Sequence, residues 1–385
     1  MTKFVFAQRL QQVQEYYFSR KLREVAQLRE QGHSILNMGI GSPDLAPHPS
    51  VIEALQSSLH FDYSHQYQSY QGLPELREAV ANFYNHHYGV SLQPSKEILP
   101  LMGSKEGIMH LSMALLNPGD EVLIPNPGYP TYASVTKIVE AEPVFYDCQE
   151  SNHWQPDFEA LEAMDTSRVK LMWVNYPHMP TGAKQSTAVF QRLVEWTAKR
   201  NIVLVNDNPY SFILNDQPQS ILDQQQLQPH VLELNSLSKS ANMAGWRVGF
   251  VCGAEDLIQA VLKVKSNMDS GMFFGLQKGA IQALSLGKDW YQELNAVYHQ
   301  RRNKIWQLAD MLGLSYDRKA VGMFVWAKLD PNHPDAETFI DELLYKHHIF
   351  ITPGTIFGSQ GKGYVRFSLC VSEELIVEAI NRLQP

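Results

Sequence analysis

Cysteine is scarce in this chain, which has only three cysteines among its 385 residues. Cys148, Cys252 and Cys370 lie more than a hundred residues apart and form no Cys-x-x-Cys pair, so the odd set predicts no disulfide framework. The 14 histidines contain no His-Glu-x-x-His motif, so a zinc site is not expected either. These absences favour a reducing, cytoplasmic location.

Long apolar runs and an excess of positive charge are also missing. No run approaches the ~18–20 apolar residues that cross a bilayer, and the first residues turn polar too early for a signal peptide. Lys and Arg number 32 against 40 Asp and Glu, which gives a net charge of −8. Because the cations are also scattered, we expect neither a membrane nor a nucleic-acid partner.

What is present is the composition of a folded protein. Apolar residues make up 44% of the chain, and 17 Phe, 17 Tyr and 7 Trp are more aromatics than a disordered chain carries. The length predicts two packed domains.

The middle of the chain alternates between short apolar runs and longer stretches with helical spacing, such as 187–200. Buried strands that alternate with helices predict a mainly parallel sheet with helices on both faces. The runs that we interpret as strands are 121–124, 169–174, 202–205 and 248–251.

The two ends of the chain predict a smaller unit. Apolar residues spaced three to four apart, Val13 among them, predict one helix over 4–31. The tail has helical patterns at 291–312, 336–347 and 373–383, and strand patterns at 323–329 and 363–369. We therefore predict an α/β fold, in which a large domain of residues 46–285 joins a smaller α+β domain built from 1–45 and 286–385.

The most informative segment is Asn235–Phe250, which reads NSLSKSANMAGWRVGF. Lys239 lies between two serines, and the next charged residue downstream is Arg247. Hydroxyls and an arginine are suited to bind a phosphate ester, and a neutral lysine amine can form a Schiff base with an aldehyde. An aldehyde together with a phosphate indicates pyridoxal 5′-phosphate.

Three other segments supply what this cofactor needs. Asp207 follows the third apolar run, at the strand end where open α/β sheets bind ligands, and its carboxylate could pair with the ring nitrogen. Tyr210 could reach the ring oxygen O3′. The segment Gly103–Gly107 opens an apolar helix whose free N–H groups suit a phosphate, and Tyr129 could stack on the ring.

In order and spacing, these motifs resemble those of the fold-type I pyridoxal-phosphate enzymes, specifically the class I/II, aspartate aminotransferase-like enzymes. The resemblance extends from Gly39 to the C-terminal helix. It implies an aminotransferase that moves an amino group from an L-amino acid to a 2-oxo acid by a ping-pong mechanism.

The resemblance also implies roles for the matching residues. Lys239 would bind the cofactor and transfer the proton, Asp207 would pair with the ring nitrogen, and Tyr210 would donate to O3′. The other residues implied to bind the cofactor are Ser104, Lys105, Tyr129, Asn175, Ser236, Ser238 and Arg247.

Two further matches concern the substrate and the neighbouring subunit. Arg366, assisted by the Gly41 backbone, resembles the arginine that binds the substrate α-carboxylate. Tyr67 resembles the tyrosine that reaches the cofactor phosphate of the other subunit, which implies a homodimer with shared active sites.

One position departs from the family pattern. The family has Asn-Pro-Thr-Gly where this chain reads Met179-Pro-Thr-Gly. The asparagine donates to O3′ and keeps the Schiff-base pKa low, whereas a thioether cannot donate. We therefore expect a higher Schiff-base pKa than in the family, unless Asn175 or His178 compensates.

Alternatives remain at this stage. A β-eliminating C–S lyase on the same fold would share every motif and would release pyruvate and ammonia without an oxo-acid acceptor. A catalytically impaired pyridoxal-phosphate-binding protein is favoured by Met179 and opposed by intact Lys239 and Asp207. A pyridoxal-binding regulator is not expected, because no helix-turn-helix pattern precedes Gly39.

The substrate is also open. No arginine occurs between Arg247 and Arg301, which argues mildly against an aspartate-type pocket because lysine lacks the bidentate fork. Alanine, aspartate and LL-diaminopimelate all stay candidates.

Overall fold

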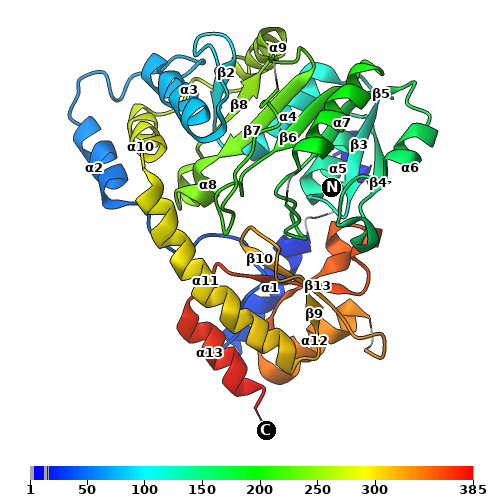
Figure 1. Ribbon diagram of the computed structural model, residues 1–385. Coiled ribbons are helices and arrows are strands. Elements are labelled where there is room, and N and C mark those ends of the chain that lie inside the picture. The colour runs from blue at the N-terminus through cyan, green and yellow to red at the C-terminus, as the bar shows by residue number, and fades with distance from the viewer. Residues whose placement is uncertain are drawn as a thin grey trace.

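The computed structural model describes residues 4–12, 15, 17–184, 186–224, 226–333 and 335–384. Its ribbon has an upper part built around a large sheet and a lower part with smaller sheets and the long helix α11 (Lys288–Met311) (Figure 1). Within the described residues, no helix is long and apolar enough to span a membrane.

The large sheet has seven strands among the described residues, in the order β2-β8-β7-β6-β5-β3-β4. Strands β4, β3, β5, β6 and β7 run parallel to one another. Strand β8 runs antiparallel to both β2 and β7. The mainly parallel sheet predicted from the apolar runs is therefore confirmed. The strand bounds are β2 Ile98–Leu101, β3 Glu121–Asn126, β4 Glu142–Asp147, β5 Val169–Val174, β6 Val203–Asp207, β7 Val231–Ser236 and β8 Gly249–Gly253.

Both faces of this sheet are buried, which is why its central strands read as continuous apolar runs. Along β5, Met172 packs into a cluster with α3, α7 and α10, whereas its neighbour Trp173 packs into another cluster with α4, α5 and α9. The covering helices are α3 Pro74–Tyr88, α7 Thr187–Ala198, α10 Phe274–Leu284, α4 Ser104–Leu115, α5 Pro130–Ile138 and α9 Glu255–Lys265.

The lower part contains a sheet of order β12-β13-β10-β9 and the parallel pair β1–β11. In that pair, Leu36 lies opposite Ile349, so residues near the N-terminus join the C-terminal segment. We retain the division into 46–285 and 1–45 with 286–385 as a proposal. The bounds are β1 Leu36–Asn37, β9 Ser315–Tyr316, β10 Phe324–Lys328, β11 Ile349–Phe350, β12 Thr352–Pro353, β13 Tyr364–Ser368, α12 Ala336–His347 and α13 Glu373–Arg382.

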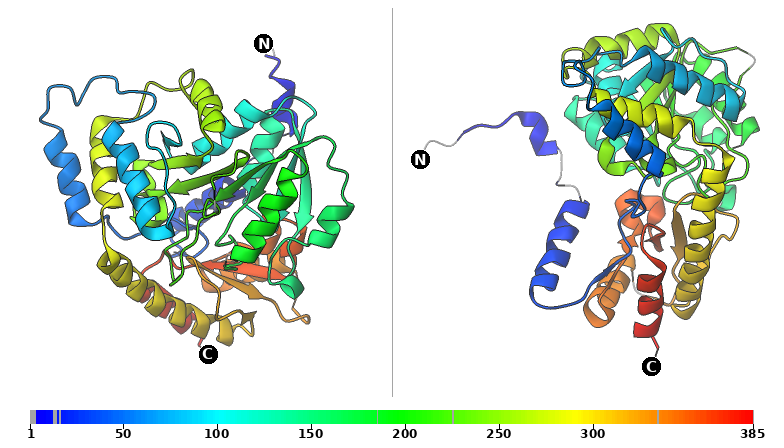
Figure 2. Two further views of the ribbon diagram at one scale, coloured as in Figure 1. Left: turned by 45° about the horizontal axis from the view of Figure 1, so that its top comes forward. Right: turned by 90° about the vertical axis from the view of Figure 1, so that its left-hand side faces the viewer.

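The prediction of one helix over residues 4–31 is wrong in its first part. Residues 4–7 are not helical, the 3-10 helix η1 covers Gln8–Gln12, and α1 covers Tyr17–Glu30. Val13 lies outside the described residues. The apolar residues Phe4 and Leu10 are exposed, so they bury no face that would stabilise a long helix. Figure 2 shows α1 beside the lower part of the molecule, while η1 lies against α5.

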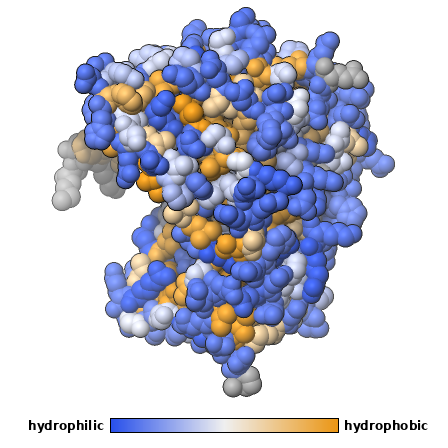
Figure 3. Space-filling model, turned by 60° about the vertical axis from the view of Figure 1, so that its left-hand side comes forward, coloured by the Kyte–Doolittle hydropathy of each residue, from blue (hydrophilic) through white to orange (hydrophobic). Residues whose placement is uncertain are grey.

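A group of exposed aromatic residues lies beside α2 (Pro49–Ser58) and α10. Figure 3 shows hydrophobic residues on the upper part of this face. Gly271, with a φ of +85°, packs so closely on the backbone of Gln68 that an added Cβ would lie 2.4 Å from its carbonyl oxygen. Two loops therefore present one surface, which we call the aromatic patch: Phe61, Tyr63, Tyr67, Tyr70 and Phe273.

Candidate active site

A cavity of about 450 Å³ lies where β5, β6 and β7 end and the upper and lower parts meet. Every site residue that the sequence predicts lines this cavity except Tyr67. The fold thus brings together side chains from Gly41 to Arg366, at the sheet edge where the parallel strands have their carboxyl ends.

Lys239 enters the cavity from the short helix α8 (Leu237–Ser240), directly after β7. Its Nζ donates a hydrogen bond of 2.6 Å to the carbonyl oxygen of Gly41. Burial lowers the pKa of Lys239, and the charges of Arg366 and Arg247 lower it further. The neutral amine, which is the nucleophilic and basic form, is therefore favoured.

Asp207 ends β6 and is only 5% exposed. Its Oδ2 accepts a 2.8 Å hydrogen bond from the hydroxyl of Tyr132, whose ring stacks on Trp173 with centroids 4.9 Å apart. Its Oδ1 is buried without a hydrogen-bond partner among the described residues. Burial raises the pKa of Asp207 to about 6, although the bond from Tyr132 opposes the shift.

Tyr132 is a site residue that sequence reasoning missed. It stands one helical turn after Tyr129, and the two rings meet edge to face at 5.6 Å. The only signal was its position in the same helix start as Tyr129, because its contact with Asp207 depends on the packing of α5 against the sheet.

One corner of the cavity is built for an anion. Helix α4 begins at Ser104, after Gly103, which has a φ of +89° and offers no capping side chain, so this helix start suits a phosphate. A Cβ on Gly103 would lie 2.1 Å from Nη2 of Arg247, so glycine is required for the guanidinium to cross the helix start. Nη1 of Arg247 also lies 3.5 Å from the hydroxyl of Ser238.

Two further residues complete this corner. The Ser236 hydroxyl accepts the N–H of Ser238 at 3.1 Å and so shapes the turn before Lys239. Burial and the nearby Arg247 lower the pKa of Lys105.

Arg366 lies on β13 opposite this corner and is 4% exposed. Its Nη2 donates to the carbonyl oxygen of Gly39 at 2.8 Å. Its guanidinium carbon lies 3.9 Å from the ring centroid of Phe324 and 4.7 Å from that of Phe357. These two rings, which the sequence analysis did not identify, fix the plane of the guanidinium.

Met179 is buried beside this arginine, with its sulfur 3.4 Å from Nη1 of Arg366. The amide of Asn175 donates to the backbone oxygen of Asp207 at 2.5 Å and accepts the Met179 N–H at 2.9 Å. His178 does not line the cavity and pairs with Thr181 at 2.7 Å. Of the two residues expected to compensate for Met179, only Asn175 is in position.

Tyr67 is 89% exposed and lies in another groove, with Phe273 on the aromatic patch. The structure does not bring it to the cavity of its own chain. Its role toward a neighbouring subunit stays a prediction.

These residues fit pyridoxal phosphate on structural grounds. The Oδ1 of Asp207 is buried and has no hydrogen-bond partner among the described residues. The N–H of the cofactor ring would supply that partner. The start of α4 with Arg247 offers an anion cradle, and the cavity volume is that of small-ligand sites.

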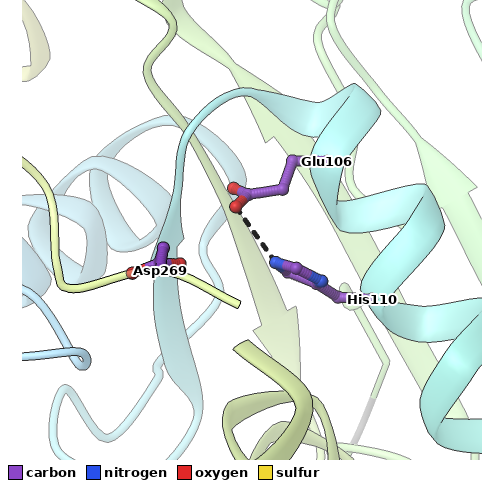
Figure 4. Close-up of side chains that lie close together, drawn as sticks. All are labelled: Glu106, His110 and Asp269. Atoms are coloured by element: carbon purple, nitrogen blue, oxygen red, sulfur yellow. Dashed lines mark hydrogen bonds and ion pairs between the residues drawn. The ribbon is translucent and has the colours of Figure 1, made fainter. Parts of the chain in front are cut away.

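Two members of a cluster of potential metal ligands lie on α4, the helix that begins at the anion corner, and the third, Asp269, lies in the segment after α9 (Figure 4). One ligand atom each from Glu106, His110 and Asp269 falls within 4.8 Å of the others. The buried ammonium of Lys265 already binds Asp269 at 2.9 Å, and Glu106 accepts the Met102 N–H at 2.5 Å. Since a cation is built into the cluster, we assign no metal to it.

The family model described as aminotransferase class I and II matches residues 33–383. The LL-diaminopimelate aminotransferase of Nitratidesulfovibrio vulgaris (strain Miyazaki F) is 36% identical over 386 residues, which span 100% of this chain and 99% of the relative. That of Moorella thermoacetica is 37% identical over 98% of this chain and 97% of its own.

Solved structures are similar over the same length. Substrate-bound BacF from Bacillus subtilis has a TM-score of 0.94 and 34% identity, covering 99% of this chain and 97% of its own. Thermus thermophilus aspartate aminotransferase with maleate has a TM-score of 0.90 and 27% identity, covering 99% of each chain.

Proposed function

The chain belongs to the class I and II aminotransferases and is a pyridoxal-phosphate-dependent enzyme, and from that premise we propose its site residues, its substrate and its assembly. The observation that carries the residue roles is that Lys239, Asp207 and Arg366 line one cavity with an anion corner.

The cofactor would be held at its two ends. Ser104, Ser238 and Arg247 bind the phosphate, and Oδ1 of Asp207 accepts the N–H of the ring. Tyr129 packs against the ring, with Lys105, Asn175 and Ser236 completing the lining. When bound, pyridoxal phosphate supplies an aldehyde for the amino group and a ring that accepts electrons.

The remaining residues act on the substrate. Arg366, clamped between two phenylalanine rings, binds the α-carboxylate bidentately and so orients the Cα–H bond. The Nζ of Lys239, whose pKa burial lowers, would take up the Cα proton in its neutral form and deliver it to the aldehyde carbon of the cofactor. Tyr210, buried at the wall of the cavity, donates its hydroxyl toward the ring oxygen.

We propose LL-diaminopimelate as the amino donor, with a 2-oxo acid as acceptor. The support is the name shared by relatives that are 36% and 37% identical over nearly the whole chain. The test is to add LL-diaminopimelate, alanine or aspartate to the loaded enzyme without an acceptor and follow its visible absorbance. Loss of the band with LL-diaminopimelate alone, and its return with 2-oxoglutarate, is expected. Release of pyruvate and ammonia without an acceptor would instead indicate a β-eliminating lyase.

We also propose a homodimer that covers the aromatic patch. Exposed aromatic residues on two adjoining loops are typical of an interaction surface, and Tyr67 at 89% exposure has most of its ring available to a second copy. A cytoplasmic location is proposed as well, with support from three free, buried cysteines.

A further inference from the structure

Glu233 is a fully buried carboxylate that the proposed reaction does not use. It lies on β7 with 0% exposure. Its Oε1 accepts the hydroxyls of Tyr84 and Ser220, each at 2.9 Å. Its Oε2 accepts the Asn206 amide at 3.1 Å and the Ile221 N–H at 3.0 Å. Burial raises the pKa of Glu233, and the hydrogen bonds from these four donors oppose the shift because they stabilise the ionised carboxylate.

In its ionised form, this buried carboxylate needs a counter-charge. Within the described residues, no lysine, arginine or histidine forms an ion pair with Glu233. The titratable groups that interact with it are Tyr84 and Tyr88 from α3, Cys252 from β8 and Asp207 from β6. None of these carries a positive charge. A buried anion of this kind is costly unless a counter-charge reaches it.

The sheet places Glu233 beside the strand end that carries Asp207, with its side chain on the opposite face of the sheet from that of Asp207. Asn206 is its register partner on β6, and Asp207 is the next residue along that strand. The bond from Asn206 to Glu233 therefore holds the strand end from which Asp207 enters the cavity. Burial, opposed by Tyr132 and assisted by the charge of Glu233, raises the pKa of Asp207 to about 6.

We propose that Glu233 is an electrostatic positioning residue, which anchors the end of β6 through Asn206 and shares with Asp207 the positive charge of the protonated cofactor ring. The ring would then be the missing counter-charge of two buried carboxylates rather than of one. This inference rests on the proposed role of Asp207.

The test compares two cofactors that differ only at the ring nitrogen: pyridoxal phosphate and its analogue with a C–H group in that position. Dissociation constants of both are measured on the cofactor-free wild type and on Glu233→Gln. This isosteric change removes the charge but keeps one oxygen to accept from Asn206 and Ile221, while its amide can donate to the two hydroxyls. In the wild type, pyridoxal phosphate should bind more tightly than the analogue. In Glu233→Gln, this preference should fall about tenfold, the equivalent of one pKa unit, while the affinity for the analogue stays the same.

The control is Glu97→Gln, which removes the same charge from a half-buried position that does not line the cavity. It should change neither affinity. Equal weakening of both cofactors by Glu233→Gln would mean a purely structural role and would overturn the inference. An undiminished preference in that variant would overturn it while leaving Asp207 in place. A wild type without any preference would refute the role of Asp207 and the inference together.

A second variant serves if Glu233→Gln does not fold. Tyr84→Phe removes one donor from the ionised carboxylate and so raises the pKa of Glu233. As the pH is raised, the tighter binding of pyridoxal phosphate relative to the analogue should then begin at a higher pH than in the wild type. An unchanged onset would count against the inference.

Discussion

The hydroxyl of Tyr132 holds one oxygen of Asp207 and leaves the other buried without a partner among the described residues. The carboxylate is thus oriented before any ligand arrives, because Tyr132 is itself fixed by its stack on Trp173. A preorganised carboxylate loses little freedom when it binds a ring N–H.

Tyr132→Phe should weaken this arrangement. Since the lost hydrogen bond stabilised the ionised carboxylate, the pKa of Asp207 rises, and the acid limb of the cofactor-affinity profile moves to higher pH. Near neutral pH, affinity should fall about fivefold, as for one net hydrogen bond. Titration of cofactor binding against pH measures both effects. Tyr146→Phe, which removes a buried hydroxyl bonded to the Trp173 backbone, is the control and should leave the profile unchanged.

Lys239→Ala should abolish turnover but not cofactor binding. The phosphate corner and Asp207 remain, whereas the amine that bonds the aldehyde and moves the proton is gone. Borohydride reduction followed by mass spectrometry should attach cofactor to the wild type and not to the variant. Turnover close to that of the wild type would refute the role of Lys239.

Gly103→Ala should separate backbone strain from the geometry of the phosphate corner. The new methyl group would collide with Arg247 and would also sit at a positive φ. Gly89→Ala is a matched control, because Gly89 has a φ of +70° with nothing within 4 Å of the added atom. Gly89→Ala should lose about 1 kcal/mol of stability in thermal unfolding, and Gly103→Ala should lose more, because Gly103 combines a φ of +89° with a ψ of 153°, a conformation nearly exclusive to glycine. Only Gly103→Ala should lose cofactor affinity, and equal affinities in the two variants would contradict the proposed corner.

Tyr67→Ala and Lys239→Ala should complement each other in a mixed dimer. If Tyr67 serves the neighbouring site, one site of the mixed dimer receives both defects and the other receives neither. The purified mixed dimer should therefore recover about half the wild-type activity from two inactive or impaired parents, as expected of shared sites with two-fold symmetry. Activity no higher than the parents' average would place both residues in one chain's site.

Met179→Asn should lower the pKa of the Schiff base formed by Lys239. An amide in place of the thioether can donate a hydrogen bond where sulfur cannot. The pH titration of the visible band should shift to lower pH in the variant. An unshifted titration would mean that the ring oxygen is already satisfied, with Asn175 as the available donor.

Most of the proposed site residues were predicted from local sequence motifs. Lys239 and Arg247 were identifiable because they share one short segment of unusual composition, and Asp207 was identifiable from its place after an apolar run and its order relative to that segment. Tyr132, Phe324 and Glu233 could not be identified in this way. Their importance arises from contacts between segments far apart in the sequence, which only the folded chain brings together.

Four strands of the large sheet, β3, β5, β6 and β8, were predictable for a similar reason, whereas β2, β4 and β7 were not identified from the sequence. Burial on both faces leaves a run such as β5 apolar except at the exposed Lys170, so it is visible without knowing its neighbours. The helix predicted over residues 4–31 failed at its start because periodicity alone does not say whether a face is covered, and Phe4 and Leu10 are not.

The pairing of β1 with β11 has a consequence for how the protein is made. Leu36 leaves the ribosome early, yet its partner Ile349 is synthesised more than three hundred residues later. The large sheet, whose strands all lie between them, can assemble first, while Gly39 and Gly41 remain beside an unpaired strand. The carboxylate-binding end of the active site is therefore completed only once Ile349 and Arg366 have been synthesised, so shorter chains acquire the cofactor cradle before they acquire a place for the substrate.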